Sequence, residues 1–253
     1  MPAFYTALGV GGATVIGALI GFLFKKTSHK LNDIMLSFAA GVMLSAAVVG
    51  LIVPSLEMGG KFGIITAIVG IFVGASVLAI IDKVVPHLHK MENGSIEGIN
   101  PEKKARVNKV LLFVIAIGIH NFPEGLAAGV SFGTGDVGRA VSVALGIALQ
   151  NIPEGMVIIA PMVAAGISRR RTFFIALLTG LVEVVGTMIG YFAVNISTFV
   201  LPFALAFAGG TMIYIISDEL IPETHSHGYE HASTYALLVG FAFMLAFDFL
   251  LAG

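Results

Sequence analysis

The sequence has 253 residues, of which 57% are hydrophobic and only 11% are charged. Soluble domains carry about 25% charged residues, so this composition excludes a water-soluble globular fold. The formal net charge of -1 gives no reason to expect a nucleic acid partner, and the absence of cysteine excludes disulfides, thiolate metal ligands and thiol nucleophiles.

Long apolar stretches recur along the whole chain. The first, 4–24, is too long for a signal-peptide core, and its positive charges, Lys25 and Lys26, follow it instead of preceding it, so we expect a retained helix with its N-terminus outside. About 20 apolar residues in a helix cross the hydrocarbon core, and only helices satisfy the backbone there in runs of this kind. The prediction is an all-α integral membrane protein with eight transmembrane helices, at 4–24, 34–55, 62–82, 108–132, 138–164, 172–194, 199–221 and 233–252.

The basic residues predict the orientation, because cytoplasmic loops carry most Lys and Arg. With the N-terminus outside, the outer loops hold only Lys61 and Arg139. The cytoplasmic loops hold the other twelve: Lys25, Lys26, Lys30, Lys83, Lys90, Lys103, Lys104, Arg106, Lys109, Arg169, Arg170 and Arg171. Both termini are therefore expected outside. The longest loop, about 83–108, is expected to be flexible and cytoplasmic, and the short remaining loops predict a single transporter domain over 1–253.

A repeated hexapeptide marks the fourth and fifth spans. The first copy runs from His120 to Gly125 as His-Asn-Phe-Pro-Glu-Gly, and the second runs from Gln150 to Gly155 as Gln-Asn-Ile-Pro-Glu-Gly. Four of the six positions are identical, and the two predicted helices run in opposite directions. Such an inverted pair is expected to meet near the bilayer midplane, where transporters place their sites.

The chemistry of the hexapeptides favours a cation. His120 and Glu124 share one helix face at i and i+4, and a Pro in each copy frees the carbonyl four residues earlier. Two Glu neutralise one divalent ion, and imidazole, carboxylate and amide ligands suit Zn²⁺, Mn²⁺ or Fe²⁺ better than Cu⁺. An ionised group at the midplane costs at least about 3 kcal/mol, so a purely structural role for the whole cluster is disfavoured.

Other polar residues within the predicted spans have two interpretations. Glu183 in the sixth span and Asp248 in the eighth either ligate metal or accept hydrogen bonds from a neighbouring helix. Met43 in the second span is by itself more typical of packing. Near the predicted inner face, His225 and His227 lie close to Asp218, Glu219 and Glu223, where they are either solvated or collect metal leaving the pore.

These residues resemble the ZIP family of metal-ion transporters, in particular its bacterial GufA-like branch. The resemblance covers nearly the whole chain and rests on the two hexapeptides and on Ser-Asp-Glu-Leu-Ile-Pro-Glu-Thr-His, which ends at His225. It implies eight helices in a 3+2+3 arrangement with inverted pseudo-symmetry, in a bacterial plasma (inner) membrane. It also implies zinc transport towards the cytoplasm, with Cd²⁺ able to substitute, and it is compatible with a homodimer.

The resemblance further implies a binuclear centre in the membrane. One metal would be held by His120, Glu124, Gln150 and Glu154, with Met43 nearby. A second would be held by Asn121, Glu124, Asn151, Glu154 and Glu183. Family members often carry Asp at one of these second-site positions, and two Asn leave the site here less negative. Glu57 would guard the entrance, and Asp33, Glu219 and His225 would line the exit.

Two alternatives stay open from the residues alone. The first is an intramembrane metal-dependent hydrolase, although the His-Glu-x-x-His motif of many such enzymes is missing. The second is a proton or monovalent-cation pathway, for which His and Gln beside two Glu supply more ligands than a proton needs. Divalent metal transport without enzymatic activity is the preferred prediction, with the metal ion and the lipid bilayer as partners.

Overall fold

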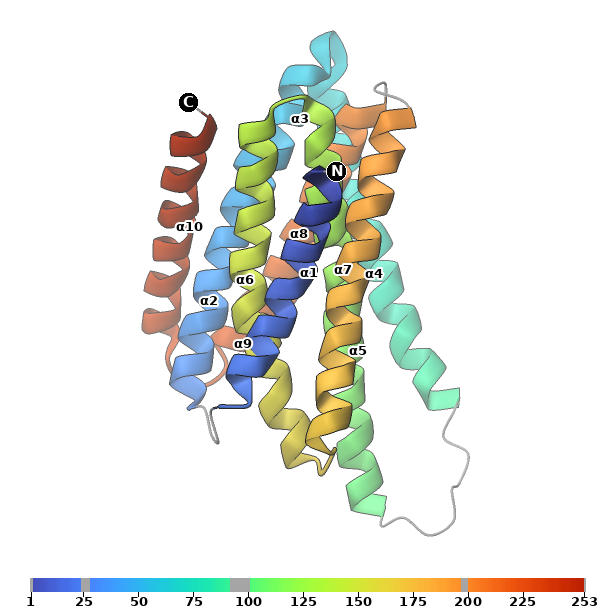
Figure 1. Cartoon of the computed structure of the whole chain (residues 1–253), viewed down its shortest axis with the longest axis vertical. Coiled ribbons are helices and arrows are strands. Elements are labelled where there is room, and N and C mark those ends of the chain that lie inside the picture. The colour runs from blue at the N-terminus through green and yellow to red at the C-terminus, as the bar shows by residue number, and fades with distance from the viewer. Residues whose placement is uncertain (1, 24–27, 92–100, 197–199, 253) are drawn as a thin grey trace.

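The computed structural model describes residues 2–23, 28–91, 101–196 and 200–252, and all regular structure in these segments is helical (Figure 1). The long helices are α1 (Pro2–Gly21), α2 (His29–Ser45), α4 (Gly63–Met91), α5 (Pro101–Ser131), α6 (Val137–Ala164), α7 (Arg169–Ile196), α8 (Leu201–Ile215) and α10 (Glu230–Ala252). The short ones are α3 (Val53–Met58) and α9 (Ile221–Thr224), with π-helical turns η1 (Ala46–Ile52) and η5 (Ile216–Leu220) and 3-10 turns η2 (Gly60–Phe62) and η3 (Phe132–Thr134).

The helices agree with the predicted spans to within a few residues at most ends. Seven helical stretches in the described part of the chain are long and apolar enough to cross a bilayer: Ala3–Gly21, His29–Met58, Gly60–Ile81, Val137–Ala164, Arg169–Val194, Leu201–Thr224 and Glu230–Leu251. The predicted span at 108–132 lies in α5 except for Phe132, and α5 is not one of the seven. The all-α membrane fold is therefore confirmed, whereas the eighth crossing stays a prediction.

The predicted loop over 83–108 is too long, because helix occupies both of its ends. α4 continues to Met91 and α5 begins at Pro101, and 92–100 lie outside the described residues. Proline at the first helical position is favoured because its missing N–H would be unpaired there anyway, and the Glu, Lys and Arg that follow are strong helix formers. Hydropathy locates the part of a helix that lies in lipid, not the place where the helix ends.

Two spans contain π-helical turns, which the hydropathy pattern gave no reason to expect. η1 joins α2 to α3, and η5 joins α8 to α9. Each turn is followed by a proline, Pro54 or Pro222. A proline in a helix leaves the carbonyl four residues earlier without its usual partner, and a π-helical turn is one way for a helix to absorb that defect. Glu219 lies in the second of these turns.

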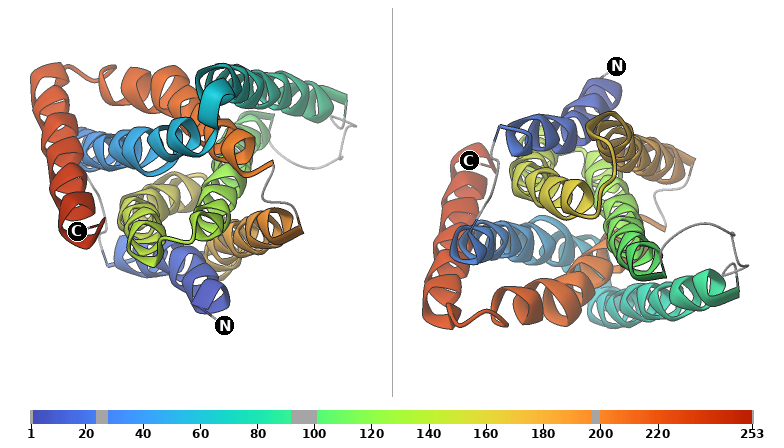
Figure 2. Two further views of the ribbon diagram at one scale, coloured as in Figure 1. Left: turned by 90° about the horizontal axis from the view of Figure 1, so that it is seen from above. Right: turned by 90° about the horizontal axis from the view of Figure 1, so that it is seen from below.

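The long helices form two sets, which Figure 2 shows on opposite sides of the bundle: α1, α5, α6 and α7 in one, and α2, α4, α8 and α10 in the other. Within the first set, Gly11 and Gly180 face each other so closely that a Cβ on either would collide with the carbonyl oxygen of the other. Gly17 of α1 meets the backbone of Ile152 in α6, and Gly186 of α7 meets the backbone of Phe122 in α5.

The contact of α1 with α6 and the contact of α7 with α5 are related by a two-fold symmetry, which exchanges α1 with α7 and α6 with α5. Gly17 and Gly186 each lie six residues after the facing glycines, and Ile152 and Phe122 are the same position of the two hexapeptides. The second set repeats the pattern, because Gly74 of α4 packs on Phe207 of α8 as Gly240 of α10 packs on Phe38 of α2. With α1 and α7 running in opposite directions (Figure 1), the contacts show an inverted pseudo-symmetry, as expected for the predicted 3+2+3 arrangement.

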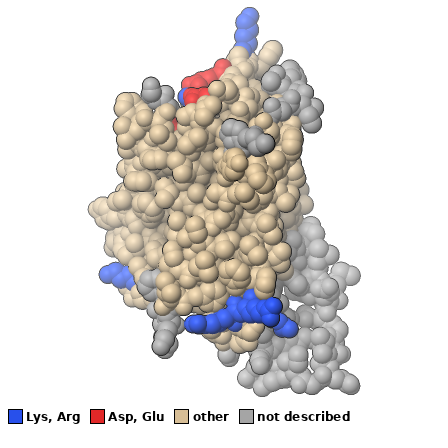
Figure 3. Space-filling view, in the orientation of Figure 1, with Lys and Arg blue, Asp and Glu red and all other residues tan. Residues whose placement is uncertain are grey.

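Charge separates the two ends of the bundle from its middle. On the face drawn in Figure 3, Lys and Arg lie near the two ends, and the band between them is uncharged. The ends of α1 and α10 that lead to the chain termini lie towards the same end of the bundle, opposite to the start of α7 (Figure 1). This distribution agrees with a bundle that crosses a bilayer.

The close approach of α1 to α6 can be tested with one methyl group. Gly17→Ala places a Cβ against the Ile152 backbone, whereas Gly12→Ala in the same helix meets nothing within 4 Å. Overpacking costs about 1–3 kcal/mol, so we expect Gly17→Ala to lower the Tm of the detergent-solubilised protein by several degrees. Gly12→Ala should leave it unchanged or slightly raised, since Ala favours helix. Equal Tm values for the two variants, measured by thermal scanning, would contradict the packing.

Candidate metal site

The two hexapeptides face each other from α5 and α6, and their polar side chains are buried. Glu124 and Gln150 are 0% exposed, His120 is 6% exposed and Glu154 is 8% exposed. Close helix packing creates this burial: a Cβ on Gly125 would meet the backbone of Glu183, and a Cβ on Gly155 would meet the backbone of Thr14. The small residue that ends each hexapeptide thus brings α5 against α7 and α6 against α1.

Several of these buried polar atoms have no hydrogen-bond partner among the described residues. They are both carboxylate oxygens of Glu124, the side-chain oxygen and nitrogen of Gln150, and the side-chain oxygens of Asn121 and Asn151. Native proteins pair about 90% or more of their buried polar groups, and an unpaired one costs about 1–3 kcal/mol or more if charged. A group of unpaired oxygens around a buried carboxylate is the donor set that a cation would satisfy.

His120 contacts a residue from outside the hexapeptides. Its Nε2 lies 2.7 Å from Oε1 of Glu219, which the π-helical turn η5 carries to this point. The sequence predicts Glu219 on the exit path, and the structure also brings it next to His120 of the first hexapeptide. Across the described segments, no three His, Asp or Glu side chains converge as a ready metal-binding group, so His120 must exchange Glu219 for the metal or share it.

A cavity of about 400 Å³ opens onto the hexapeptides from one end of the bundle. His120, Glu124 and Glu154 line it, together with acidic residues of η5 and α9, Asp218, Glu219 and Glu223. Its apolar walls include Leu36, Ile117 and Val157, each on the side of the motifs towards the predicted cytoplasmic loops. Among the four polar side chains of the hexapeptides named above, Glu124 and Gln150 are the least exposed and Glu154 is the most exposed. This order is expected for a cavity that narrows with distance from the cytoplasmic loops.

On the other side of the hexapeptides the bundle is filled with apolar side chains. Met43, Leu51, Val143 and Ile147 are 0% exposed and belong to one buried cluster. Met43 does not line the cavity, and its packing within this cluster matches the structural interpretation of that residue. The site is therefore open towards one end and closed towards the other.

The residues predicted for a second metal come together, but through hydrogen bonds. Glu183 accepts bonds from Thr14 Oγ1 at 2.9 Å, from Asn121 Nδ2 at 2.5 Å and from Asn151 Nδ2 at 2.7 Å. Each asparagine directs its amide N–H groups, not its carbonyl oxygen, to the carboxylate. In this arrangement the Glu183 carboxylate accepts hydrogen bonds from three helices, α1, α5 and α6.

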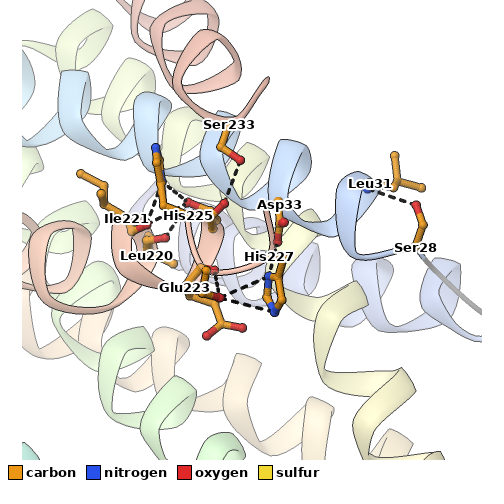
Figure 4. Close-up of polar contacts among 11 residues, drawn as sticks. Ser28, Leu31, Asp33, Leu220, Ile221, Glu223, His225, His227 and Ser233 are labelled. Atoms are coloured by element: carbon orange, nitrogen blue, oxygen red, sulfur yellow. Dashed lines mark hydrogen bonds and ion pairs between the residues drawn. The ribbon is translucent and has the colours of Figure 1, made fainter. Parts of the chain in front are cut away.

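At the predicted cytoplasmic end, the exit residues are arranged differently from the expectation (Figure 4). Asp33 is buried, and its Oδ1 lies 3.1 Å from Nδ1 of His227. The ring of His29 stacks on His227 with 4.6 Å between centroids. His225 instead uses Nδ1 on the Ile221 carbonyl oxygen at 2.8 Å and Nε2 on Thr234 Oγ1 at 3.1 Å. His227, supported by His29, is thus the histidine that reaches Asp33.

The sequence does contain a signal for the contribution of His29, since His29 and Asp33 are four residues apart at the start of α2 and share a helix face.

Glu57, the predicted entrance residue, is exposed at the opposite end and lies 3.3 Å from Arg139. Asp248 is buried in α10 with Oδ1 unpaired, but it does not line the cavity.

Comparisons with known proteins find relatives that match nearly the whole chain. The family model described as ZIP Zinc transporter matches residues 82–248. Zinc transporter GufA of Myxococcus xanthus is 38% identical over 248 residues, covering 96% of each chain. Zinc transporter ZupT of Chlorobaculum parvum is 40% identical over 261 residues, covering 98% of this chain and 97% of the relative. Zinc transporter ZIPB of Bordetella bronchiseptica is 37% identical over 248 residues, covering 93% of this chain and 77% of the relative.

The one-sided cavity can be tested by thiol labelling, because the sequence has no native cysteine. Val157→Cys places a thiol on the cavity wall, and Ile147→Cys places one in the closed apolar cluster of the same helix. A membrane-impermeant maleimide should label Val157→Cys from the side of the Arg169 loop only, and should leave Ile147→Cys unlabelled. Labelling of Ile147→Cys at a comparable rate from either side would contradict the closed end.

Proposed function

The chain belongs to the ZIP zinc transporter family, and from that premise we propose that it carries zinc ions across a membrane through the buried cluster around Glu124. Its relatives are zinc transporters and not enzymes, so neither a hydrolase nor a proton or monovalent-cation pathway is favoured. The one observation that carries the assignment of the site is the carboxylate of Glu124, fully buried and unpaired where the cavity ends.

The ligands that we propose for the transported ion are His120, Glu124, Gln150 and Glu154. Glu124 and Glu154 together neutralise a divalent charge, and His120 supplies an imidazole nitrogen. Mixed nitrogen and oxygen ligands of this kind suit zinc, and Cd²⁺, Fe²⁺ and Mn²⁺ are further candidates. A sulfur ligand from Met43 is not part of the proposal, because its side chain packs in the apolar cluster.

The proposed path runs from Glu57 at the closed end to Glu219 and Asp33 at the open end, with His227 in the place expected for His225. Ligand exchange drives the last step: zinc leaving Glu124 meets Glu219, which already lies 2.7 Å from His120. When the Glu219 carboxylate releases the His120 imidazole, the imidazole can bind the metal. The freed carboxylate can then bind the metal itself. The acidic residues of η5 and α9 then offer successive oxygen ligands along the cavity.

We propose that the open end faces the cytoplasm of a bacterial inner membrane. The basic residues concentrate at the loops on that side, which supports this orientation. In it both termini lie outside, and the direction that we propose for transport is inward. The packing of both helix sets into one bundle supports a single transporter domain over 1–253. A homodimer, which the family resemblance allows, stays a prediction.

Removing either carboxylate should stop transport. For Glu124→Ala and Glu154→Ala we expect zinc uptake into proteoliposomes to fall at least about tenfold, since an uncompensated charge in a desolvated site costs several kcal/mol and 1.4 kcal/mol is already tenfold. Glu230→Ala, at the exposed start of α10, is the matched control and should transport normally. Near-normal uptake by a folded Glu124→Ala protein would reject the site.

Protons should compete with zinc for this site. Carboxylates and imidazole bind metal only in deprotonated form, so binding displaces whatever protons they hold. We expect zinc affinity to weaken as the pH falls from about 7.5 to about 5, and we expect calorimetry in buffers of different ionisation enthalpy to report proton release. Affinity that is independent of pH, without proton release, would contradict ligation by these side chains.

A further inference from the structure

Glu183 is the most heavily hydrogen-bonded carboxylate in the membrane part of the chain that the structure describes. It is 0% exposed and accepts three bonds from three different helices, from Thr14 of α1, Asn121 of α5 and Asn151 of α6. Both of its oxygens are used, Oε1 by Thr14 and Asn121 and Oε2 by Asn151. Three donors satisfy an ionised carboxylate without a metal ion.

The orientation of the two amides is determined by more than this one acceptor. Asn121 Nδ2 also donates to the Thr179 carbonyl oxygen at 3.3 Å, and Asn151 Nδ2 also donates to the Val10 carbonyl oxygen at 3.1 Å. Each NH₂ group thus has an acceptor for each of its two hydrogens. If either amide rotated by half a turn, its oxygen would face the Glu183 carboxylate and a backbone carbonyl. Three hydrogen-bond acceptors would then lie together without a donor.

A second cation beside Glu183 would therefore meet N–H groups, which cannot ligate a metal. To bind there it would have to rotate both amides and break the four bonds that they donate. With the nitrogens held by Glu183, the amide oxygens of Asn121 and Asn151 are left buried and unpaired. They lie on the same helices as Glu124 and Glu154, three residues away, and hence near the same face.

The pseudo-symmetry supports the same interpretation. Three residues after the facing glycines Gly11 and Gly180, α1 has Thr14 where α7 has Glu183. The two side chains bond each other at 2.9 Å, and Asn121 and Asn151 are equivalent positions of the two hexapeptides. The network thus joins symmetry-related residues of all four helices in the first set, as expected of an element that holds this set together.

From this geometry we infer that Glu183 is a positioning residue that holds Asn121 and Asn151, and that the buried site binds one divalent cation instead of two. The inference rests on the proposed function, because it concerns the number of ions at the Glu124 cluster. It differs from the binuclear centre that the family resemblance implies.

The number of bound zinc ions tests this directly. Native mass spectrometry of the purified full-length protein counts them, and Glu124→Ala supplies the background from other zinc-binding groups, such as His29 and His227. The wild-type protein should bind one zinc more than Glu124→Ala. A difference of two would overturn the inference while leaving the proposed function intact, and no difference would overturn the proposed site together with the inference.

Substitutions at the network add an independent readout. Asn151→Asp replaces a donor to Glu183 by a second carboxylate and should raise the count by one zinc. Asn121→Asp should do the same from the other helix, should the first variant not fold. Glu183→Gln, which keeps the shape, should also keep the wild-type count, and a loss of zinc from that variant would show that Glu183 is itself a ligand.

Discussion

An ionised carboxylate at the middle of a bilayer costs at least about 3 kcal/mol, and Glu124 has no hydrogen-bond partner in the described chain to offset that cost. Glu183 is equally buried but has three donors. The two carboxylates therefore need opposite explanations. Glu183 is stabilised by three hydrogen bonds from the protein, whereas Glu124, which lacks such bonds, is placed to be stabilised by the divalent cation that we propose enters the cavity.

The backbone follows a two-fold symmetry that the side chains break. Glycine contacts place α1 on α6 as they place α7 on α5, and π-helical turns followed by proline recur in the second set. At η5 the turn carries Asp218 and Glu219, which line the cavity, while η1 has Gly50 and Leu51, buried among apolar side chains. Hydration favours opening beside the acidic turn, and burial of apolar surface favours closure beside the other. The cavity thus opens at one end because η5 has acidic residues at the positions where η1 has Gly50 and Leu51.

Sequence reasoning was most successful where physical periodicity or repetition carried the information. The length of apolar runs predicted the helices, and the repeated hexapeptide predicted that Glu124 and Glu154 would lie buried together with His120. It failed where the outcome depended on rotation about a side-chain bond or on distant contacts. Which nitrogen of which histidine reaches Asp33, or which atom of Asn121 faces Glu183, depends on neighbours far away in the chain.

The extent of helices beyond the bilayer was also missed. Hydropathy reports transfer into lipid and not helix propensity, so it predicts loop at positions that the ends of α4 and α5 occupy. The π-helical turns left no periodic signal, and for that reason the sequence could not bring Glu219 next to His120.

X-ray absorption at the zinc edge, with one equivalent of zinc bound to the purified protein, tests the central claim most directly. The account predicts nitrogen and oxygen ligands at about 2.0–2.1 Å, no sulfur at about 2.3 Å, and a single imidazole whose scattering disappears in His120→Ala. Imidazole scattering that persists unchanged in His120→Ala would contradict the account, since it would place the bound zinc on histidines outside the membrane and not at Glu124.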